Sequence, residues 1–256
     1  VCSSDLNASY KVVSDLMIFY AGAEGDLKQN TYLDFVAENP FVSPTLYITP
    51  TDKQYDVFAG LKGKLADNVS YNLRASYINE RNKALFKSND YTVNAANEDY
   101  AFGNSLQVVY DDMKTLSFFG ELKADVSENV SFGINGTFSS YTNKNEAEPW
   151  NLPAIKLSSS LDYIISPKWY VGTDVFYVGE RKDFKLNLYN LYATAPSPII
   201  LDSYFDVNAH VGFKYSDRLT TYLRANNITN QSYERTLNYP VQGFQIVIGA
   251  NYKFDF

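Results

Sequence analysis

The sequence predicts an all-β fold: a transmembrane antiparallel β-barrel, of which this chain forms the C-terminal half with about eleven strands. Three observations lead to this prediction. Apolar and polar residues alternate in successive runs, with the period of a strand and not of a helix. Most runs have at least the roughly 9–11 residues with which a tilted strand crosses a bilayer. Short turns alternate with longer polar stretches, which is the arrangement of outer-membrane barrels.

The run 242–256 shows the alternation most clearly. One of its faces is apolar and rich in aromatic residues, whereas the other is polar except for Val247. The apolar face consists of Phe244, Ile246, Ile248, Ala250, Tyr252, Phe254 and Phe256.

The run 203–215 alternates in the same way, and it predicts which face meets lipid. Its apolar face is expected to contact lipid, and its polar face is expected to line a wet lumen. The apolar set is Phe205, Val207, Ala209, Val211 and Phe213. The lumen-facing set is Asp206, Asn208, His210 and Lys214.

Eleven such runs are predicted as strands. The run 104–126 is counted as one strand, with Asp111 and Asp112 in a bulge or in an extension beyond the membrane, because only then do all the short turns fall on one side. Complete single-chain bacterial barrels have even strand counts, and twice eleven gives the roughly 22 strands of plugged transporters. We therefore expect this chain to form an open sheet in isolation. The runs are 7–13, 16–25, 53–65, 69–82, 104–126, 129–142, 154–165, 168–181, 203–215, 218–228 and 242–256.

Five short segments between these runs share one pattern: an apolar residue, Ser or Ala, then Asp, Glu or Pro, any residue, and an apolar residue. Residues of the types Ser, Asp, Asn and Pro favour tight turns, because their side chains cap backbone N–H groups or fix φ. We predict periplasmic hairpin turns at these segments and extracellular loops in the longer polar stretches. The turns are 13–17, 65–69, 126–130, 165–169 and 215–219, and the loops are 25–51, 83–103, 143–153, 183–202 and 229–241.

The composition agrees with a membrane barrel. The 256 residues include 22 Tyr and 17 Phe, and Tyr in particular suits the membrane interface, where one end of the ring is apolar and the other is wet. The mean hydropathy is −0.28 and no apolar run approaches the roughly 20 residues of a transmembrane helix. A net charge of −7 argues against a nucleic-acid partner.

The first six residues, VCSSDL, lack the basic and apolar regions of a signal peptide. They resemble the translation of a sequencing adapter, so residues 1–6 are expected to be non-native and residues 7–256 to be the partial barrel. An ordinary loop is the alternative. Cys2 is the only cysteine, which excludes a disulfide within the chain.

The end of the chain resembles TonB-dependent outer-membrane receptors. The resemblance lies in the segment NNITNQSYE at 226–234, the segment NYP at 238–240, Gly243 and the alternating run to Phe256. The stretches 30–51 and 61–86 also look like receptors of Bacteroidetes-type bacteria. The sequence differs from the family pattern in two details. Val241 and Gln242 separate Pro240 from Gly243, and Phe244 stands where Arg is common.

The resemblance implies a bacterial outer-membrane receptor that takes up a siderophore, vitamin or glycan-type nutrient. Its partners would be outer-membrane lipid, TonB, which binds through an N-terminal part missing here along with the plug domain, and the barrel-assembly machinery. That machinery would read the final strand through Tyr252, Phe254 and Phe256. Two alternatives stay open: a passive porin or structural barrel without a plug, and a soluble β-rich binding module.

No catalytic constellation, cofactor motif or metal-ligand cluster stands out, so we expect no enzyme activity, no cofactor and no metal site. His210 is the only histidine, and a solvated lumen residue is favoured over a ligand contact. Aromatic residues in two predicted loops are candidates for ligand contacts, with loop packing as the alternative. These residues are Trp150, Phe184, Tyr189 and Tyr192.

Overall fold

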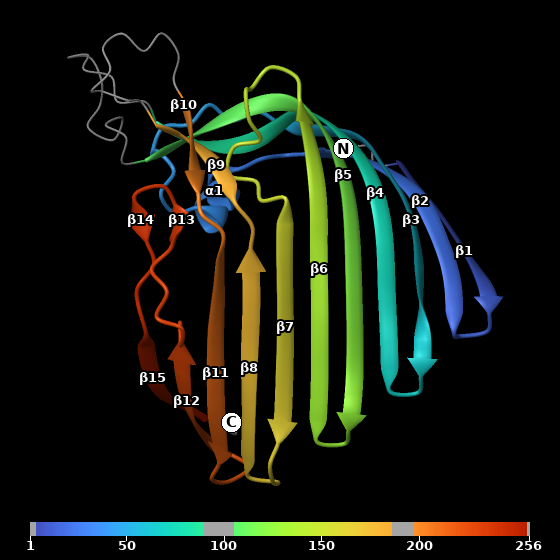
Figure 1. Ribbon diagram of the computed structural model, residues 1–256, viewed down its shortest axis with the longest axis vertical. Helices are drawn as coiled ribbons and strands as arrows, with labels where there is room; N and C mark the ends of the chain where they lie inside the picture. Colours follow the sequence, from blue (N-terminus) through green and yellow to red (C-terminus); the bar gives the residue numbers. More distant parts are fainter. Residues whose placement is uncertain (1–3, 90–104, 186–196, 255–256) are drawn as a thin grey trace.

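The structure is a computed structural model that describes residues 4–89, 105–185 and 197–254. Eleven strands form one antiparallel sheet in chain order, which curves around one side (Figure 1). They are β1 (Ser4–Val13), β2 (Met17–Lys28), β3 (Thr51–Ala66), β4 (Val69–Ser88), β5 (Leu106–Ser127), β6 (Val130–Asn143), β7 (Ile155–Ile164), β8 (Trp169–Val178), β11 (Tyr204–Lys214), β12 (Leu219–Asn226) and β15 (Gln245–Tyr252).

Smaller elements lie in the longer connections. They are helix α1 (Tyr32–Glu38), a ribbon of β9 (Arg181–Lys185) with β10 (Ser197–Leu201), and a ribbon of β13 (Glu234–Thr236) with β14 (Tyr239–Pro240). No helix in the described part of the chain is long and apolar enough to cross a membrane.

The sheet confirms the prediction of eleven antiparallel strands in an open arrangement. Strands β1 and β15 form its two edges and do not pair with each other. The predicted run 104–126 corresponds to one strand, β5, which spans Leu106–Ser127, and the irregularity expected at Asp111 and Asp112 lies opposite them, in β4. There the register shifts between Glu80 and Lys83, and Asn82 between them adopts a positive φ of 51°. A bulge in β4 therefore lets β5 continue.

Several predicted boundaries were wrong. Strand β4 continues to Ser88 instead of ending at 82, and β15 ends at Tyr252. Strand β1 begins at Ser4, so residues 4–6 pair with residues 23–25 of β2. The expected non-native origin of residues 1–6 stays a prediction.

The five predicted turns join neighbouring strands at one end of the sheet (Figure 1). Serine side chains cap several of them, as the sequence pattern predicts. Ser166 Oγ accepts a hydrogen bond from the N–H of Trp169 at 3.1 Å, and Ser216 Oγ accepts one from Leu219 at the same distance. In the first turn, Ser14 has a φ of 38° and the N–H of Leu16 bonds to the carbonyl of Val13.

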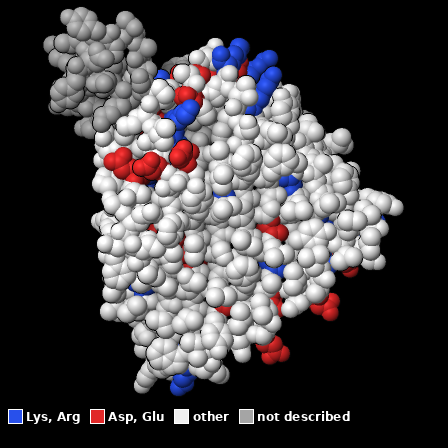
Figure 2. All heavy atoms as spheres, in the orientation of Figure 1, with Lys and Arg blue, Asp and Glu red and all other residues white. Residues whose placement is uncertain are grey.

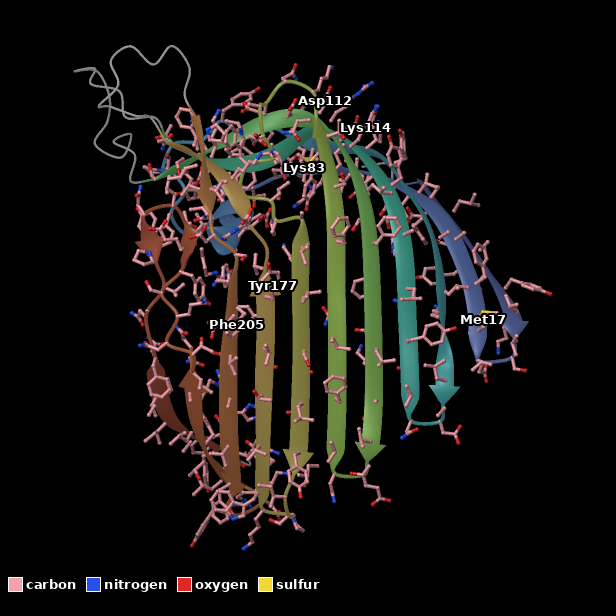
Figure 3. All side chains as sticks on the ribbon, viewed as in Figure 1. Met17, Lys83, Asp112, Lys114, Tyr177 and Phe205 are labelled. Carbon is pink, nitrogen blue, oxygen red and sulfur yellow. The ribbon has the colours of Figure 1, made fainter. Side chains whose placement is uncertain are left out.

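The two faces of the sheet have the polarity that the alternation predicts. Large apolar side chains are exposed on the convex face, where Tyr177 and Phe205 point outward (Figure 3). The concave face carries polar groups, for example the ion pair of Arg74 with Asp56 at 3.0 Å. Exposed apolar side chains on one face of a curved sheet fit a lipid-facing surface.

Glycines on the concave face make room for tyrosines of the neighbouring strand. A Cβ atom at Gly60, Gly212 or Gly249 would collide with the ring of Tyr20, Tyr170 or Tyr222, respectively. Each ring thus covers a glycine across the strand pair, which restores packing where a glycine has no side chain and pins the register.

We predict that Val211→Lys destabilises the complete barrel, because Val211 lies on the convex face between its register partners Val171 and Leu223. A Lys near the bilayer midplane should cost about 2–4 kcal/mol. The matched change His210→Lys, one residue away on the concave face, should cost less than about 1 kcal/mol. Urea unfolding in lipid vesicles measures both, and equal costs would contradict the assignment of the faces.

Candidate functional site

The described parts of the longer connections lie at the end of the sheet opposite the tight turns (Figure 1). The centre of this folded mouth is the part of the β4–β5 hairpin that lies beyond the bulge. Successive side chains of a strand point to opposite faces. Neighbouring residues of this part of the hairpin therefore pack against different loops.

One face of the hairpin holds a cluster around Leu85 and Met113, to which Trp150 and Phe184 belong. Trp150 and Phe184 are only 3% and 7% exposed, and their rings meet edge to face at 6.3 Å. The indole Nε1 of Trp150 donates to Glu146 at 2.6 Å. The contacts of these two candidate ligand residues are therefore with the loop core, and ligand binding by them stays a prediction. The other two candidates, Tyr189 and Tyr192, lie outside the described residues.

Asp111 holds the β6–β7 connection against the hairpin. Its buried carboxylate accepts hydrogen bonds from the backbone N–H groups of Lys144, Asn145 and Glu146 and from the side-chain amide of Asn145. The neighbouring Asp112 instead pairs with the Lys144 ammonium at 2.9 Å. The two carboxylates thus serve different contacts on opposite sides of one strand, which the sequence analysis did not foresee.

The opposite face of the hairpin binds the β2–β3 connection. Phe35 of α1 and Val42 pack against Val108, with Phe86 beside them. Helix α1 was not predicted, and it is closed at its start by a capping box in which Thr31 and Asp34 bind each other's backbone N–H groups.

This connection, residues 29–50, is called the strap from here on. It runs along the concave side of the sheet, behind the strands in Figure 1, and reaches the β12–β15 connection. There Asn39 Nδ2 donates to Thr236 Oγ1 at 3.2 Å, and the ring of Phe41 stacks on Tyr239 with centroids 3.6 Å apart. Contacts between residues about 200 positions apart therefore tie the two sides of the sheet together across its mouth.

The strap presents apolar groups to solvent at the mouth. Leu33 is 76% exposed and Tyr47 is 79% exposed, with Tyr32 also exposed on the first turn of α1. These residues are candidates for ligand contact that the sequence analysis missed. The only signal in the sequence was an aromatic and apolar segment inside a stretch predicted as a polar loop.

The four predicted lumen residues of β11 lie along the concave face and do not form one site. Asp206, at the mouth, accepts a hydrogen bond from the Tyr233 hydroxyl at 2.7 Å, and Asn208 accepts one from the N–H of Asn227 at 3.0 Å. His210 lies over Gly172, and Lys214 is exposed at the turn end. No group of three or more potential metal ligands occurs among the described residues.

Tyr233 anchors the β12–β15 connection to the wall. Its ring stacks on Tyr204 with centroids 3.9 Å apart, and the guanidinium of the buried Arg181 lies over Tyr204 while donating to the carbonyls of Glu234 and Arg235. Burial and the adjacent Asp206 carboxylate raise the pKa of Tyr233 well above its ordinary value. The phenol therefore stays protonated and keeps donating to Asp206 across the physiological pH range.

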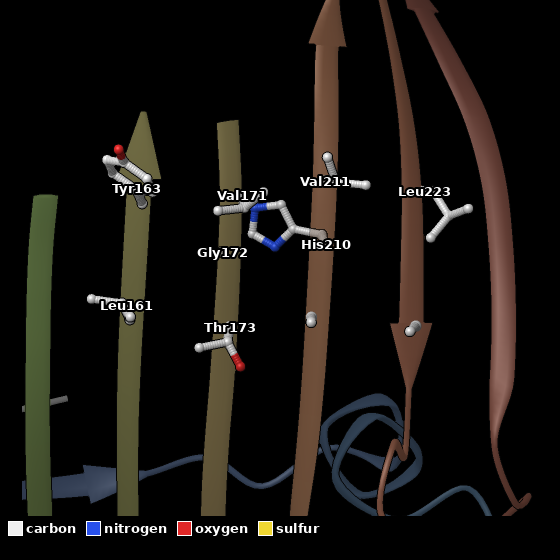
Figure 4. A pocket seen from close by; sticks show the side chains of 10 residues that line it. Leu161, Tyr163, Val171, Gly172, Thr173, His210, Val211 and Leu223 are labelled. Carbon is white, nitrogen blue, oxygen red and sulfur yellow. The ribbon is translucent and has the colours of Figure 1, made fainter. Parts of the chain in front are cut away.

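A depression on the convex face is apolar and has a volume of about 390 Å³ (Figure 4). Its floor consists of the small residues Thr173, Ala209 and Ala225, and Leu161 and Leu223 stand at its sides. Because this face is the lipid-facing one, the depression is not a candidate site for a polar ligand.

Comparison with known proteins identifies the fold. No family model and no curated protein matches the sequence. Solved structures do match. They include the ferripyoverdine receptor of the outer membrane of Pseudomonas aeruginosa (15% identity, TM-score 0.68) and the ferric-catecholate import receptor Fiu from Escherichia coli K12 (13% identity, TM-score 0.67). They also include the siderophore receptor PirA from Acinetobacter baumannii (15% identity, TM-score 0.69).

The chain has the fold of part of an outer-membrane receptor barrel. In each of the three comparisons, 98% of this chain is covered. The chain spans 32%, 34% and 41% of the length of the three receptors, respectively.

We predict that Asp111→Ala loosens the β6–β7 connection. The change leaves the backbone N–H groups of Asn145 and Glu146 without this acceptor, whereas that of Lys144 keeps its bond to the carbonyl of Asp112, and it should cost about 1–3 kcal/mol. The control Asp112→Ala removes an exposed ion pair and should cost less than about 1 kcal/mol. Limited proteolysis should cut near residues 144–147 in the first variant only. Equal resistance of both variants would show that Asp111 is not the anchor.

Proposed function

We propose that this chain is part of the barrel of a TonB-dependent outer-membrane receptor that takes up a siderophore, vitamin or glycan-type nutrient, in a bacterium of the Bacteroidetes type. The observation that carries the proposal is an open eleven-stranded sheet. In the comparisons with the ferripyoverdine receptor and the siderophore receptor PirA, 98% of this chain is covered. The resemblance at 226–256 supports the same assignment from the sequence side.

The passive porin is disfavoured by the strap. A porin needs an open aqueous lumen. Here residues 29–50 run across the concave side and are fixed by Phe41 and Asn39 at the far connection. A segment fixed across the concave side suits a receptor that recognises its ligand before admitting it.

The proposal is tested with the gene that contains this chain at its full length. Binding of ferric siderophores, cobalamin and oligosaccharides to the purified receptor is measured by calorimetry, and uptake is compared in cells with and without TonB. Uptake that needs TonB supports the proposal. Ligand-independent conductance in planar bilayers, with no binding of any of these probes, would favour the porin.

We predict that the strap contributes to ligand affinity. Replacing the exposed Leu33 and Tyr47 by Ser should weaken binding roughly tenfold, which corresponds to the loss of about 1.4 kcal/mol of apolar contact. The strap should stay in place, because Phe35 and Phe41, which hold it, are unchanged. A variant with serines at Leu65 and Val126, exposed at the opposite end of the sheet, is the matched control. Unchanged affinity in the strap variant would exclude these residues as contacts.

We also propose that the final strand is read by the barrel-assembly machinery. Tyr252 and Phe254 meet edge to face at 4.8 Å on the lipid-facing stripe, and Phe256 lies outside the described residues. Deletion of Phe256 in the full-length receptor should lower the amount of folded protein in the outer membrane far more than Tyr252→Ala does. Equal, mild losses would leave Phe256 as one interface aromatic among others.

A further inference from the structure

A polar cavity of about 440 Å³ lies at the mouth, between the segment that joins β10 to β11 and the β12–β15 connection. Residues 200–203 form one wall and residues 231–234 form the other, with Pro240 beside them. Asp202 and Ser232 are exposed, so the cavity opens to solvent. Its volume lies within the range of about 300–1,000 Å³ that small-molecule sites occupy. We call it the acidic cavity from here on, because Asp202 and Glu234 line it.

The walls of the acidic cavity are held in place by contacts behind them. Gln231 Oε1 accepts a hydrogen bond from a backbone N–H at the start of β11 at 3.2 Å. The ring of Tyr233 stacks on Tyr204, and the buried Arg181 donates to the carbonyl of Glu234 at 2.8 Å. Walls that are already ordered lower the entropy cost when a ligand binds between them.

Several polar groups of the acidic cavity can only accept hydrogen bonds. Among the described residues, the carboxylate of Asp202 has no hydrogen bond or ion pair. Glu234 Oε2 accepts a bond from the N–H of Asn238 at 3.2 Å, and Oε1 has no partner in the described part of the chain. The hydroxyl of Tyr233 donates its proton to Asp206 at 2.7 Å, so its oxygen can otherwise only accept. The acidic cavity therefore requires a ligand that supplies hydrogen-bond donors.

The charge of the acidic cavity is negative. Its charged lining groups are the carboxylates of Asp202 and Glu234, and no Lys, Arg or His of the described residues lines it. Arg235, the residue after Glu234, is exposed and lies outside the lining. Figure 2 shows acidic side chains gathered on this side of the mouth, at the upper left. Anionic ligands are therefore repelled from the acidic cavity, and cationic ligands are attracted to it.

We propose that the acidic cavity binds a primary ammonium group, so that part of the nutrient that this receptor takes up is cationic. The N–H donors of an ammonium match the carboxylates of Asp202 and Glu234 and a hydroxyl of Ser203 or Ser232. A metal ion such as Ca²⁺ needs about six to eight oxygen ligands, whereas no group of three or more potential metal ligands occurs among the described residues. The inference rests on the proposed function and adds the charge of the ligand to it.

The test uses spermidine, a flexible polyamine, as the probe. Its diacetylated form, in which both primary ammonium groups are amides, is the matched ligand without them. Binding of each to the purified full-length receptor in detergent micelles is measured by calorimetry. We expect spermidine to bind roughly tenfold more tightly than its diacetylated form, because acetylation removes both ion pairs. Asp202→Asn and Glu234→Gln, which keep the size of the side chain, should each weaken spermidine binding roughly fivefold.

The matched control is the double variant Glu128→Gln and Asp217→Asn, which removes two exposed carboxylates at the tight turns, at the opposite end of the sheet. Its affinity for spermidine should equal that of the unchanged receptor. Equal losses in this control and in the double variant at Asp202 and Glu234 would show general charge attraction and would overturn the proposal. Absence of spermidine binding, or equal affinity for the two forms of the probe, would overturn it as well.

Two further outcomes separate the alternatives. Binding of Ca²⁺ alone that the substitutions at Asp202 and Glu234 abolish, without binding of spermidine, would exclude the ammonium as the occupant. If Glu234→Gln does not fold, Asp202→Asn alone decides, because it removes no hydrogen bond of the described residues. Uptake of another nutrient that needs TonB, in a receptor that does not bind spermidine, would refute this inference and leave the proposed function standing.

Discussion

The structure depends on one constraint: in hydrocarbon, every backbone N–H and C=O group must find its partner within the protein. The sheet meets this constraint by pairing each strand with its neighbour in the order β1 to β15, and only the outer edges of β1 and β15 are left without a partner strand. The register is fixed by a second constraint, the polarity of the side chains, since a slip of one residue would turn a polar face toward lipid. Bulges such as the one at Asn82 are placed beyond the apolar stripe, where unpaired groups can reach water or side chains.

Above the lipid-facing stripe, backbone groups can also bond to water and to side chains. There the packing of side chains, and not the lipid, determines which residues are apolar. The β4–β5 hairpin no longer has a lipid side and a lumen side, because loops cover both of its faces. Ala84, Leu85 and Phe86 are accordingly three apolar residues in a row, the pattern of a strand that is buried on both sides. Buried carboxylates such as Asp111 and Asp183 then supply the acceptors that irregular loop backbone requires.

This difference explains how much could be predicted from the sequence. The strands and the outward residues of β11 were predictable, because lipid on one side and water on the other impose a strict alternation over the whole crossing. The mouth was not predictable in the same way. Helix α1 has only seven residues, too few for its period to stand out, and it depends on the Thr31 cap. The burial of Trp150 depends on contacts with β4 and β9, which no local pattern contains.

The strap belongs to the mouth, but its contacts also bear on the strands of the sheet. Strand pairing alone leaves the curvature of an open sheet free to change, because hydrogen bonds between neighbours constrain each pair and not the distance between the edges. The stacking of Phe41 on Tyr239 and the bond from Asn39 to Thr236 connect the second hairpin of the sheet to its last one. These two contacts are therefore cross-links between opposite sides of the sheet that strand pairing does not supply, and they depend on side chains of irregular segments and not on the β alternation.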